Sequence, residues 1–414
     1  MMAGAIGALA ATLVVAIAWR NAWAPAVGAL LGVAIAFLGG AATTADVEHA
    51  AIDLWRPLLV IVSIMTTSAC AAELGVFAHM AEWIEPRTRG PVRHAFRLVF
   101  VLAALCAAVL SNDAAILMFT PVVIELLRQV YPKRHGKFVL AFAFAVFVAA
   151  GVAPLATGNP MNLVVAQRAG IGFNEYALRM IPVALAGWIA AYLALAWYFR
   201  AELADEAPAR GGRLPTANPV DTPARLVLLA AGGSIIAYPI LAYFGQPLWI
   251  VAVPTALICV AAALSRGIAL RNVARGVSWE LIPFVFGVLV LATALARAGV
   301  TDALAELYAR SPAPMPTVAA VAAVGSALIN NHPMALLHSV TLADSSDTLV
   351  YAALVGGDLG PRLLPIGSLA GLLWLHTLRL RGVAIPLGTF IRVGLVVTIP
   401  SLIVSLAVLW LVTL

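Results

Sequence analysis

The sequence predicts an all-α membrane protein that crosses the bilayer many times. Apolar residues make up 63% of the 414 residues and charged residues only 11%, whereas soluble domains have about 45–50% and about 25%. Apolar runs of membrane-spanning length follow one another along nearly the whole chain. Polar interruptions, Ser111-Asn112-Asp113 and Asn330-Asn331-His332, occur at corresponding places in the two halves. Such paired interruptions are typical of the binding sites of secondary transporters.

The apolar runs of the first half recur in the same order in the second half. A span takes about 20 apolar residues. The runs of the first half lie at roughly 3–19, 23–40, 57–79, 93–110, 114–130, 138–169 and 177–199. Those of the second half lie at roughly 226–243, 247–264, 277–298, 315–329, 333–350, 351–380 and 387–412. We therefore predict two inverted repeats, 1–199 and 225–414, joined by a cytoplasmic linker at 200–224.

The interrupted pairs of runs at about 93–130 and 315–350 are predicted to be re-entrant hairpins. Strongly basic loops on both sides of the first pair stay in the cytoplasm, which fits a hairpin but also fits two full spans. The polar tips favour hairpins, because non-helical backbone in the middle of a bilayer is tolerated only where it is buried in protein or lines a cavity. The runs at about 138–169 and 351–380 contain Gly and Pro and are predicted to be broken helices.

The charges in the loops predict the orientation. With hairpins, each half has an odd number of full crossings, about ten in total, so the halves have opposite orientations. Placing both termini outside leaves most of the 25 Lys and Arg residues in cytoplasmic loops, as expected. The exceptions are Arg56, Arg168, Arg179, Arg297, Arg310 and, in the second break, Arg362.

Polar side chains at the tips and breaks are the candidate binding residues, because such groups are costly inside a bilayer unless they serve a function. Amide and hydroxyl groups offer both hydrogen-bond donors and acceptors. These candidates are Ser111, Asn112, Thr157, Asn159, Asn162, Asn330, Asn331, Gly367 and Ser368. Asp113, Asp358 and His332 are the titratable residues at the same places. An alternative for Asp358 is an interfacial ion pair with Arg362, four residues along a helix.

Several classes of protein are excluded by what the sequence lacks. It has no GxxxxGK[ST] phosphate loop, no HExxH or GxSxG signature and no CxxC or Cys/His cluster. We therefore expect no cofactor, no metal site and no enzymatic activity, and energy from an ion gradient or from a separate ATPase subunit. The net charge of +6 reports orientation in the membrane rather than binding of nucleic acid.

Two segments resemble a known family. Ser111-Asn112-Asp113-Ala114-Ala115-Ile116-Leu117, with Thr120-Pro121, is similar to the hairpin signature of the ArsB-type arsenite and antimonite efflux permeases of the ion-transporter superfamily. The second segment is more specific. It comprises Gly357-Asp358-Leu359-Gly360-Pro361, Pro365-Ile366-Gly367-Ser368-Leu369-Ala370 and Leu372-Leu373-Trp374-Leu375-His376.

The resemblance implies a transporter of the bacterial inner membrane that works by elevator-like alternating access. Its members export arsenite and antimonite, neutral trihydroxides at neutral pH, in exchange for protons and sometimes together with a cytosolic ATPase. Carried over by motif, the candidate residues above would bind the trihydroxide. Proton coupling would fall to Asp113 first, then to Asp358 and His332.

Two departures from the family pattern leave other functions open. His332 stands where family members have an apolar residue, and the segment from Thr157 to Asn162 is closer to that of the related anion carriers. The main alternative is a sodium- or proton-coupled carrier of a small anion such as a dicarboxylate. An anion site would need a cationic partner, and Arg362 is the only candidate in the sequence. This scarcity argues mildly against the anion carrier. A channel-like subunit of an ATP-driven pump is a third hypothesis.

Overall fold

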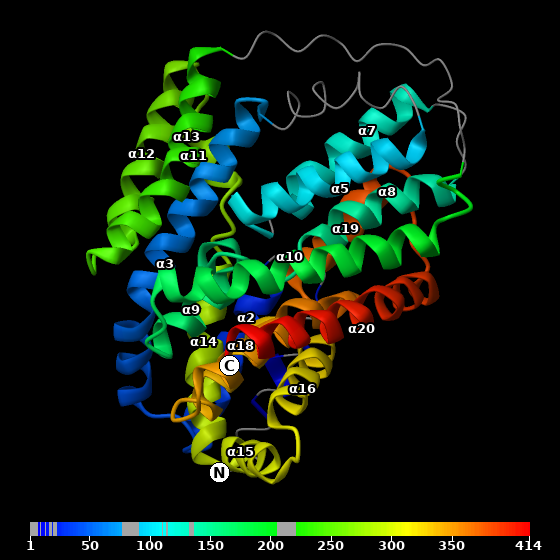
Figure 1. Ribbon diagram of the computed structural model, residues 1–414. Coiled ribbons are helices and arrows are strands. Elements are labelled where there is room, and N and C mark those ends of the chain that lie inside the picture. Colours follow the sequence, from blue (N-terminus) through cyan, green and yellow to red (C-terminus); the bar gives the residue numbers. More distant parts are fainter. Residues whose placement is uncertain are drawn as a thin grey trace.

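The computed structural model describes residues 23–76, 91–109, 111–112, 115–131, 136–204 and 221–414, with scattered positions before residue 23. All regular elements in these ranges are helices (Figure 1). The all-α architecture predicted from the sequence is therefore confirmed. The linker predicted at 200–224 lies largely outside the described residues.

In the described part of the first half, a hairpin, a broken helix and a long helix follow α2 (Ala24–Leu38) and α3 (Thr44–Glu73) in that order. The elements after α3 are α5 (Val92–Val109), the π-helical turn η2 (Ala115–Phe119), α7 (Thr120–Val130), α8 (Gly136–Ala149), the 3-10 turn η3 (Ala156–Gly158), α9 (Pro160–Arg168) and α10 (Phe173–Tyr198).

The second half repeats this order after its own leading helices. Its elements are α11 (Thr222–Tyr243), α12 (Trp249–Ser265), α13 (Leu270–Arg275), α14 (Leu281–Arg297), α15 (Val300–Arg310), α16 (Pro314–Ile329), α17 (Asn331–Thr341), α18 (Asp347–Leu359), the 3-10 turns η4 (Gly360–Arg362) and η5 (Pro365–Gly367), α19 (Leu369–Leu380) and α20 (Leu387–Val412). Both α10 and α20 have 26 residues, and they pack against each other across the middle of the molecule (Figure 1).

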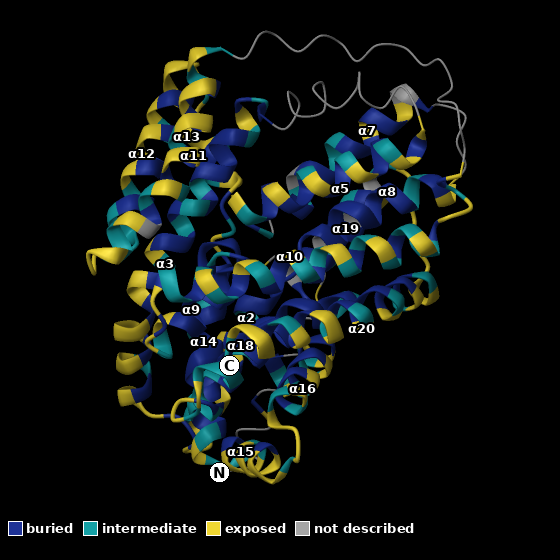
Figure 2. Cartoon of the chain, in the orientation of Figure 1, coloured by how far each residue is buried: buried dark blue, intermediate teal, exposed yellow. Residues whose placement is uncertain are grey.

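Many of the helices have the length and composition of membrane spans. Within the described residues, the helices that are long and apolar enough to cross a membrane are α3, α5, α10, α11 and α20. The pair α14 and α15 would make a sixth span, bent by 71°. The apolar helices α2, α8, α12 and α16 are shorter. Large apolar residues of α10, α11 and α20 are exposed, for example Leu178, Leu229 and Ile403. Figure 2 shows exposed positions in yellow along these helices. A lipid environment accounts for such exposure. The number of crossings, about ten, stays a prediction.

The second hairpin ends earlier than the sequence predicts. Its second arm, α17, stops at Thr341 rather than near residue 350, and α18 begins at Asp347. The reason is the polar run Asp344-Ser345-Ser346, since Asp and Ser favour turns over helix interiors. At the tip of the first hairpin, Leu110, Asp113 and Ala114 lie outside the described residues.

The two halves interleave instead of lying side by side. The short helix α9 of the first half packs against α17 of the second hairpin, and α19 of the second half packs against η2 of the first hairpin. Each broken helix therefore meets the hairpin of the other half. This crossing brings the polar tips and breaks of both halves to one place.

Close packing of α16 on α18 depends on small residues. A Cβ atom at Gly356 would collide with the backbone oxygen of Ala319 and lie 2.8 Å from Ala322 Cβ. Gly360 faces the backbone oxygen of Ala323 in the same way. Small residues at such spacing let helix backbones approach closely inside membranes.

We expect Gly356→Ala to lower the free energy of unfolding by about 1–3 kcal/mol, because the added methyl group forces α16 and α18 apart. Gly357→Ala is the matched control, since a Cβ atom there meets only Ser326 Oγ, at 3.8 Å. Thermal unfolding of the purified variants in detergent measures both. Equal stability of the two variants would contradict the packing argument.

Candidate functional site

A small polar cavity lies where the hairpins and the broken helices meet. Its volume is about 40 Å³, room for about three water-sized groups. Both halves of the chain contribute to it. Its polar lining consists of Asn112, Asn159, Asn331, His332, Asp358, Arg362 and Ser368. We call it the central cavity.

Asp358, near the end of α18, accepts hydrogen bonds from three groups of the first half. Its Oδ1 atom accepts from Asn159 Nδ2 at 2.6 Å. Its Oδ2 atom accepts from Asn162 Nδ2 at 2.8 Å and from the backbone N–H of Ala153 at 2.9 Å. The side chain is buried. One carboxyl group thus joins the second broken helix to the first.

The break in the first broken helix makes these donors available. Pro154 and Gly158 disfavour continuous helix between α8 and α9, so the N–H of Ala153 has no partner within a helix and is free to reach Asp358. The helix restarts at Pro160, with Asn159 as its N-cap accepting from the backbone N–H of Met161 at 3.0 Å. Proline in the first turn behind an Asn cap is a favoured helix start.

Tyr176 of α10 completes this network. Its hydroxyl accepts from Asn162 Nδ2 at 2.9 Å and donates to the backbone oxygen of Ala153 at 3.0 Å. The side chain is fully buried. Tyr176 therefore fixes both the amide and the loop that hold Asp358.

At the tip of the second hairpin, Asn330 adopts a strained backbone conformation. Its φ of 80° and ψ of 147° lie where residues other than glycine are rare, and it is the one non-glycine residue with positive φ in the described ranges. Its Nδ2 atom donates to the backbone oxygen of Ile366 at 3.1 Å, and its Oδ1 atom accepts from the N–H of His332 at 3.2 Å. The tip is thus held against the second break.

In the first half, an asparagine likewise joins the hairpin tip to the break by a hydrogen bond. Asn112 Nδ2 donates to the backbone oxygen of Gly151, at the start of the first break, at 3.1 Å. The second break also restarts behind a polar cap, because Ser368 Oγ accepts from the N–H of Gly371 at 2.9 Å. In both halves an amide links hairpin tip to break, and a polar side chain caps the helix that follows.

Arg362 and His332 also line the central cavity and are almost completely buried. Arg362 Nη2 donates to the backbone oxygen of Val148, and His332 Nδ1 lies 2.7 Å from Asn331 Oδ1. Arg362 therefore donates a hydrogen bond to the end of α8, whereas Asp358 accepts hydrogen bonds from the first break. The alternative of a simple interfacial ion pair between Asp358 and Arg362 does not describe this buried arrangement.

The structure brings most of the predicted site residues together. Six of them line the central cavity: Asn112, Asn159, Asn331, Ser368, Asp358 and His332. Asn162 and Asn330 do not line the cavity but hold parts of its wall. Asn162 donates to Asp358, and Asn330 donates to the backbone oxygen of Ile366. Gly367 is a packing residue, because a Cβ atom there would lie 2.7 Å from Pro361 Cα.

The remaining predicted residues lie elsewhere. Thr157 faces a second, smaller cavity whose hydroxyl lining comes from Thr67, Ser234, Tyr238 and Thr255. Ser111 is buried but does not line the central cavity. Asp113 lies outside the described residues.

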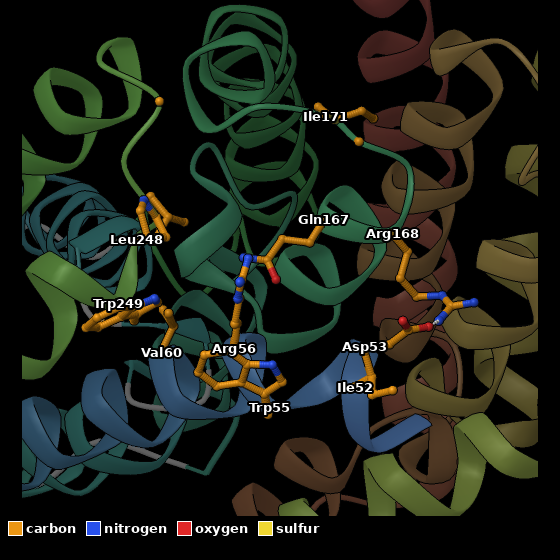
Figure 3. Close-up of a pocket in the computed structure, with 13 residues that line it drawn as sticks. Ile52, Asp53, Trp55, Arg56, Val60, Gln167, Arg168, Ile171, Leu248 and Trp249 are labelled. Carbon is orange, nitrogen blue, oxygen red and sulfur yellow. Dashed lines mark hydrogen bonds and ion pairs between the residues drawn. The ribbon is translucent and has the colours of Figure 1, made fainter. Parts of the chain in front are cut away.

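A larger pocket of about 870 Å³ lies apart from the central cavity, between α3, the far end of α9 and the start of α12. Figure 3 shows Arg56 of α3 extending toward Gln167 of α9, and Arg168 of α9 paired with Asp53. None of the predicted site residues lines this pocket. Within the described ranges, no group of three or more His, Cys, Asp or Glu side chains is placed to hold a metal ion.

Comparison with known proteins gives the family. The family model described as ArsB, arsenical pump membrane protein, matches residues 5–413. The chain belongs to this family. An arsenical pump membrane protein of Escherichia coli is 30% identical over 99% of this chain and 98% of its own length. One of Yersinia enterocolitica is also 30% identical over the same shares.

A solved structure supports the fold. The YdaH transporter of Alcanivorax borkumensis superimposes with a TM-score of 0.59 at 16% sequence identity, covering 86% of this chain and 85% of that protein. The family model and the relatives at 30% identity confirm, over nearly the whole chain, the resemblance to the ArsB family seen in the hairpin and in the last broken helix. This ArsB-family chain is a multi-pass membrane protein.

Two members of the Asp358 network were missed by the analysis of the sequence. Ala153 contributes a backbone N–H and therefore leaves no side-chain signal. Tyr176 comes from α10, an ordinary apolar helix, and its hydroxyl is recognisable only once α10 is placed beside the first break. Arg362 was considered as a partner for an anion but was not included among the site residues of this ArsB-family protein.

We expect Asn330→Ala to lower the free energy of unfolding by about 2 kcal/mol, because it removes a helix cap and the bond to Ile366. Asn330→Gly loses the same bonds but relieves the strained φ, so it should cost clearly less. Thermal unfolding of both variants measures the difference. If glycine is no better than alanine at this position, the strain argument is wrong.

Proposed function

We propose that this ArsB-family protein is a secondary active transporter of the bacterial inner membrane that exports arsenite and antimonite in exchange for protons. The observation that carries the proposal is the central cavity, a buried polar site built from both halves of an arsenical pump family member. Its place between two hairpin tips and two broken helices is the arrangement that secondary transporters use for their substrates.

The size and the chemistry of the central cavity suit a trihydroxide. A volume of about 40 Å³ takes about three water-sized groups, which is the size of a molecule with three hydroxyls on one atom. The amides of Asn112 and Asn331 and the hydroxyl of Ser368 offer both donors and acceptors. Thr157, which faces another cavity, would act on the path to the site rather than in it.

Asp358 is the best-supported candidate for proton coupling. Burial away from water favours the protonated form of a carboxyl group, and N–H donors favour the ionised form. Both act on Asp358, so a small change around the carboxyl group can change its protonation. We propose that the substrate binds while Asp358 is ionised and held by Asn159 and Asn162, and that protonation weakens these bonds, so that substrate and proton exclude each other at Asp358. Asp113 remains a second candidate for proton coupling.

Elevator-like alternating access is the motion that we propose. The hairpins and broken helices contact one another around the central cavity, whereas α3, α11 and α12 contact one another beside them. Movement of the first group along the second would carry the cavity across the bilayer. A cytosolic ATPase would add a second source of energy, since this chain has no phosphate loop.

A sodium- or proton-coupled carrier of a small anion is the second candidate function. The guanidinium of Arg362 in the central cavity favours it, since a fixed positive charge attracts anions. The carboxyl group of Asp358 in the same cavity opposes it. A dicarboxylate is also larger than the room the cavity offers.

Uptake of arsenite into everted membrane vesicles tests the proposal. We expect accumulation under an imposed proton gradient without ATP, and none under a sodium gradient alone. No arsenite movement under either gradient would contradict the proposal and favour the anion carrier, which uptake of a radiolabelled dicarboxylate would then reveal.

We expect Asp358→Asn to abolish proton-driven uptake while the protein remains in the membrane, because an amide cannot take up and release the proton. Asp302→Asn, at an exposed position on α15, is the matched control and should transport normally. Uptake by Asp113→Asn in the same assay shows whether that residue shares the coupling. Normal proton-driven uptake by the Asp358 variant would exclude Asp358 as the proton carrier.

A further inference from the structure

The central cavity contains two buried polar side chains whose hydrogen-bonding capacity is only partly used. Among the described residues, Arg362 Nε, Arg362 Nη1 and His332 Nε2 have no hydrogen-bond partner. The side chains are only 3% and 6% exposed, and both line the same cavity. Buried polar atoms without partners are rare in folded proteins, and each is costly. A charged group in this state is more costly still.

The partners of His332 determine what its free nitrogen offers. Its Nδ1 atom lies 2.7 Å from Asn331 Oδ1 and 3.2 Å from Asn330 Oδ1. Asn330 Oδ1 also accepts from a backbone N–H, which identifies it as the oxygen of the amide. Amide oxygens only accept, so Nδ1 carries the proton and Nε2 presents a lone pair. His332 is therefore an acceptor in the cavity, whereas Arg362 offers only donors.

Both side chains are held in place before any ligand arrives. Arg362 is bonded to the backbone oxygen of Val148 and lies against Gly151, where a Cβ atom would collide with Nη2. The ring of His332 lies beside Phe284, with 5.4 Å between the ring centroids. Groups fixed in advance lose little conformational entropy on binding.

We propose that Arg362 and His332 bind the substrate directly, Arg362 donating to one oxygen and His332 Nε2 accepting from a hydroxyl. The inference rests on the proposed function and adds the two side chains that contact its substrate. Because Arg362 and Asp358 carry opposite charges in one cavity, their charges cancel, and the cavity selects small neutral hydroxylated acids over anions. This assigns binding to His332, in place of the proton coupling predicted from the sequence.

Two variants remove the free atoms and keep the existing bonds. His332→Asn retains an N–H donor near the Nδ1 position and deletes the acceptor at the Nε2 position. Arg362→Gln retains a donor toward Val148 and deletes the charge. His49→Gln and Arg310→Gln, both at exposed positions, are the matched controls.

Binding of arsenite to the purified full-length protein in nanodiscs, measured by equilibrium dialysis, tests the proposal. We expect each variant to weaken binding about tenfold or more and the controls to bind like the parent protein. We also expect nitrite, a small anion, not to compete with arsenite. Thermal unfolding of His332→Asn without arsenite separates binding from structure: removing its unpaired buried acceptor should leave the unfolding temperature unchanged or raise it.

Parent-like affinity in either variant, or a lowered unfolding temperature that accompanies the loss of binding in His332→Asn, would overturn the direct role. Competition by nitrite would overturn the selection for neutral acids. Failure of the proposed function looks different, because the parent protein itself would then neither bind nor transport arsenite.

Discussion

The hydrogen bonds between Asp358 and the first broken helix are the interaction on which the rest of the site depends. A carboxyl group this deep in an apolar protein needs donors on both oxygens. Two asparagine amides and one backbone N–H supply them. The backbone N–H of Ala153 is available only because the helix is interrupted before α9. The interruption is therefore needed to satisfy the carboxyl group of Asp358. Since the donors come from the other half, Asp358 also joins the two halves.

The two halves connect hairpin tip and break in the same way but with different residues. Each hairpin tip is tied to the backbone of its own break by an asparagine, Asn112 in the first half and Asn330 in the second. Each helix after the break begins behind a polar cap, Asn159 or Ser368. The halves differ in charge, because Asp358 and Arg362 both belong to the second break. The carboxyl group there reaches across to the first break, and the guanidinium reaches the end of α8.

Hydropathy and the placement of polar residues were enough to predict the helical membrane fold, the interruptions between helices and six residues that line the central cavity. These features are local, because apolar run length and helix-breaking residues can be read directly. That the hairpins are re-entrant stays a prediction. Features that depend on the packing of distant elements could not be read in this way. Thr157 belongs to the same break as Asn159, yet it faces another cavity because of where α3 and α12 lie. The end of α17 was also misplaced, since the turn at Asp344 interrupts an otherwise apolar run.

Competition between the substrate and a proton at Asp358 is the central claim of this account. It is tested most directly by measuring protons released when arsenite binds to the purified protein in weakly buffered solution, at a pH where the apo site is protonated. The account predicts that binding releases protons and that Asp358→Asn binds arsenite without releasing them. Arsenite binding by the parent protein with no release of protons at any pH would contradict it.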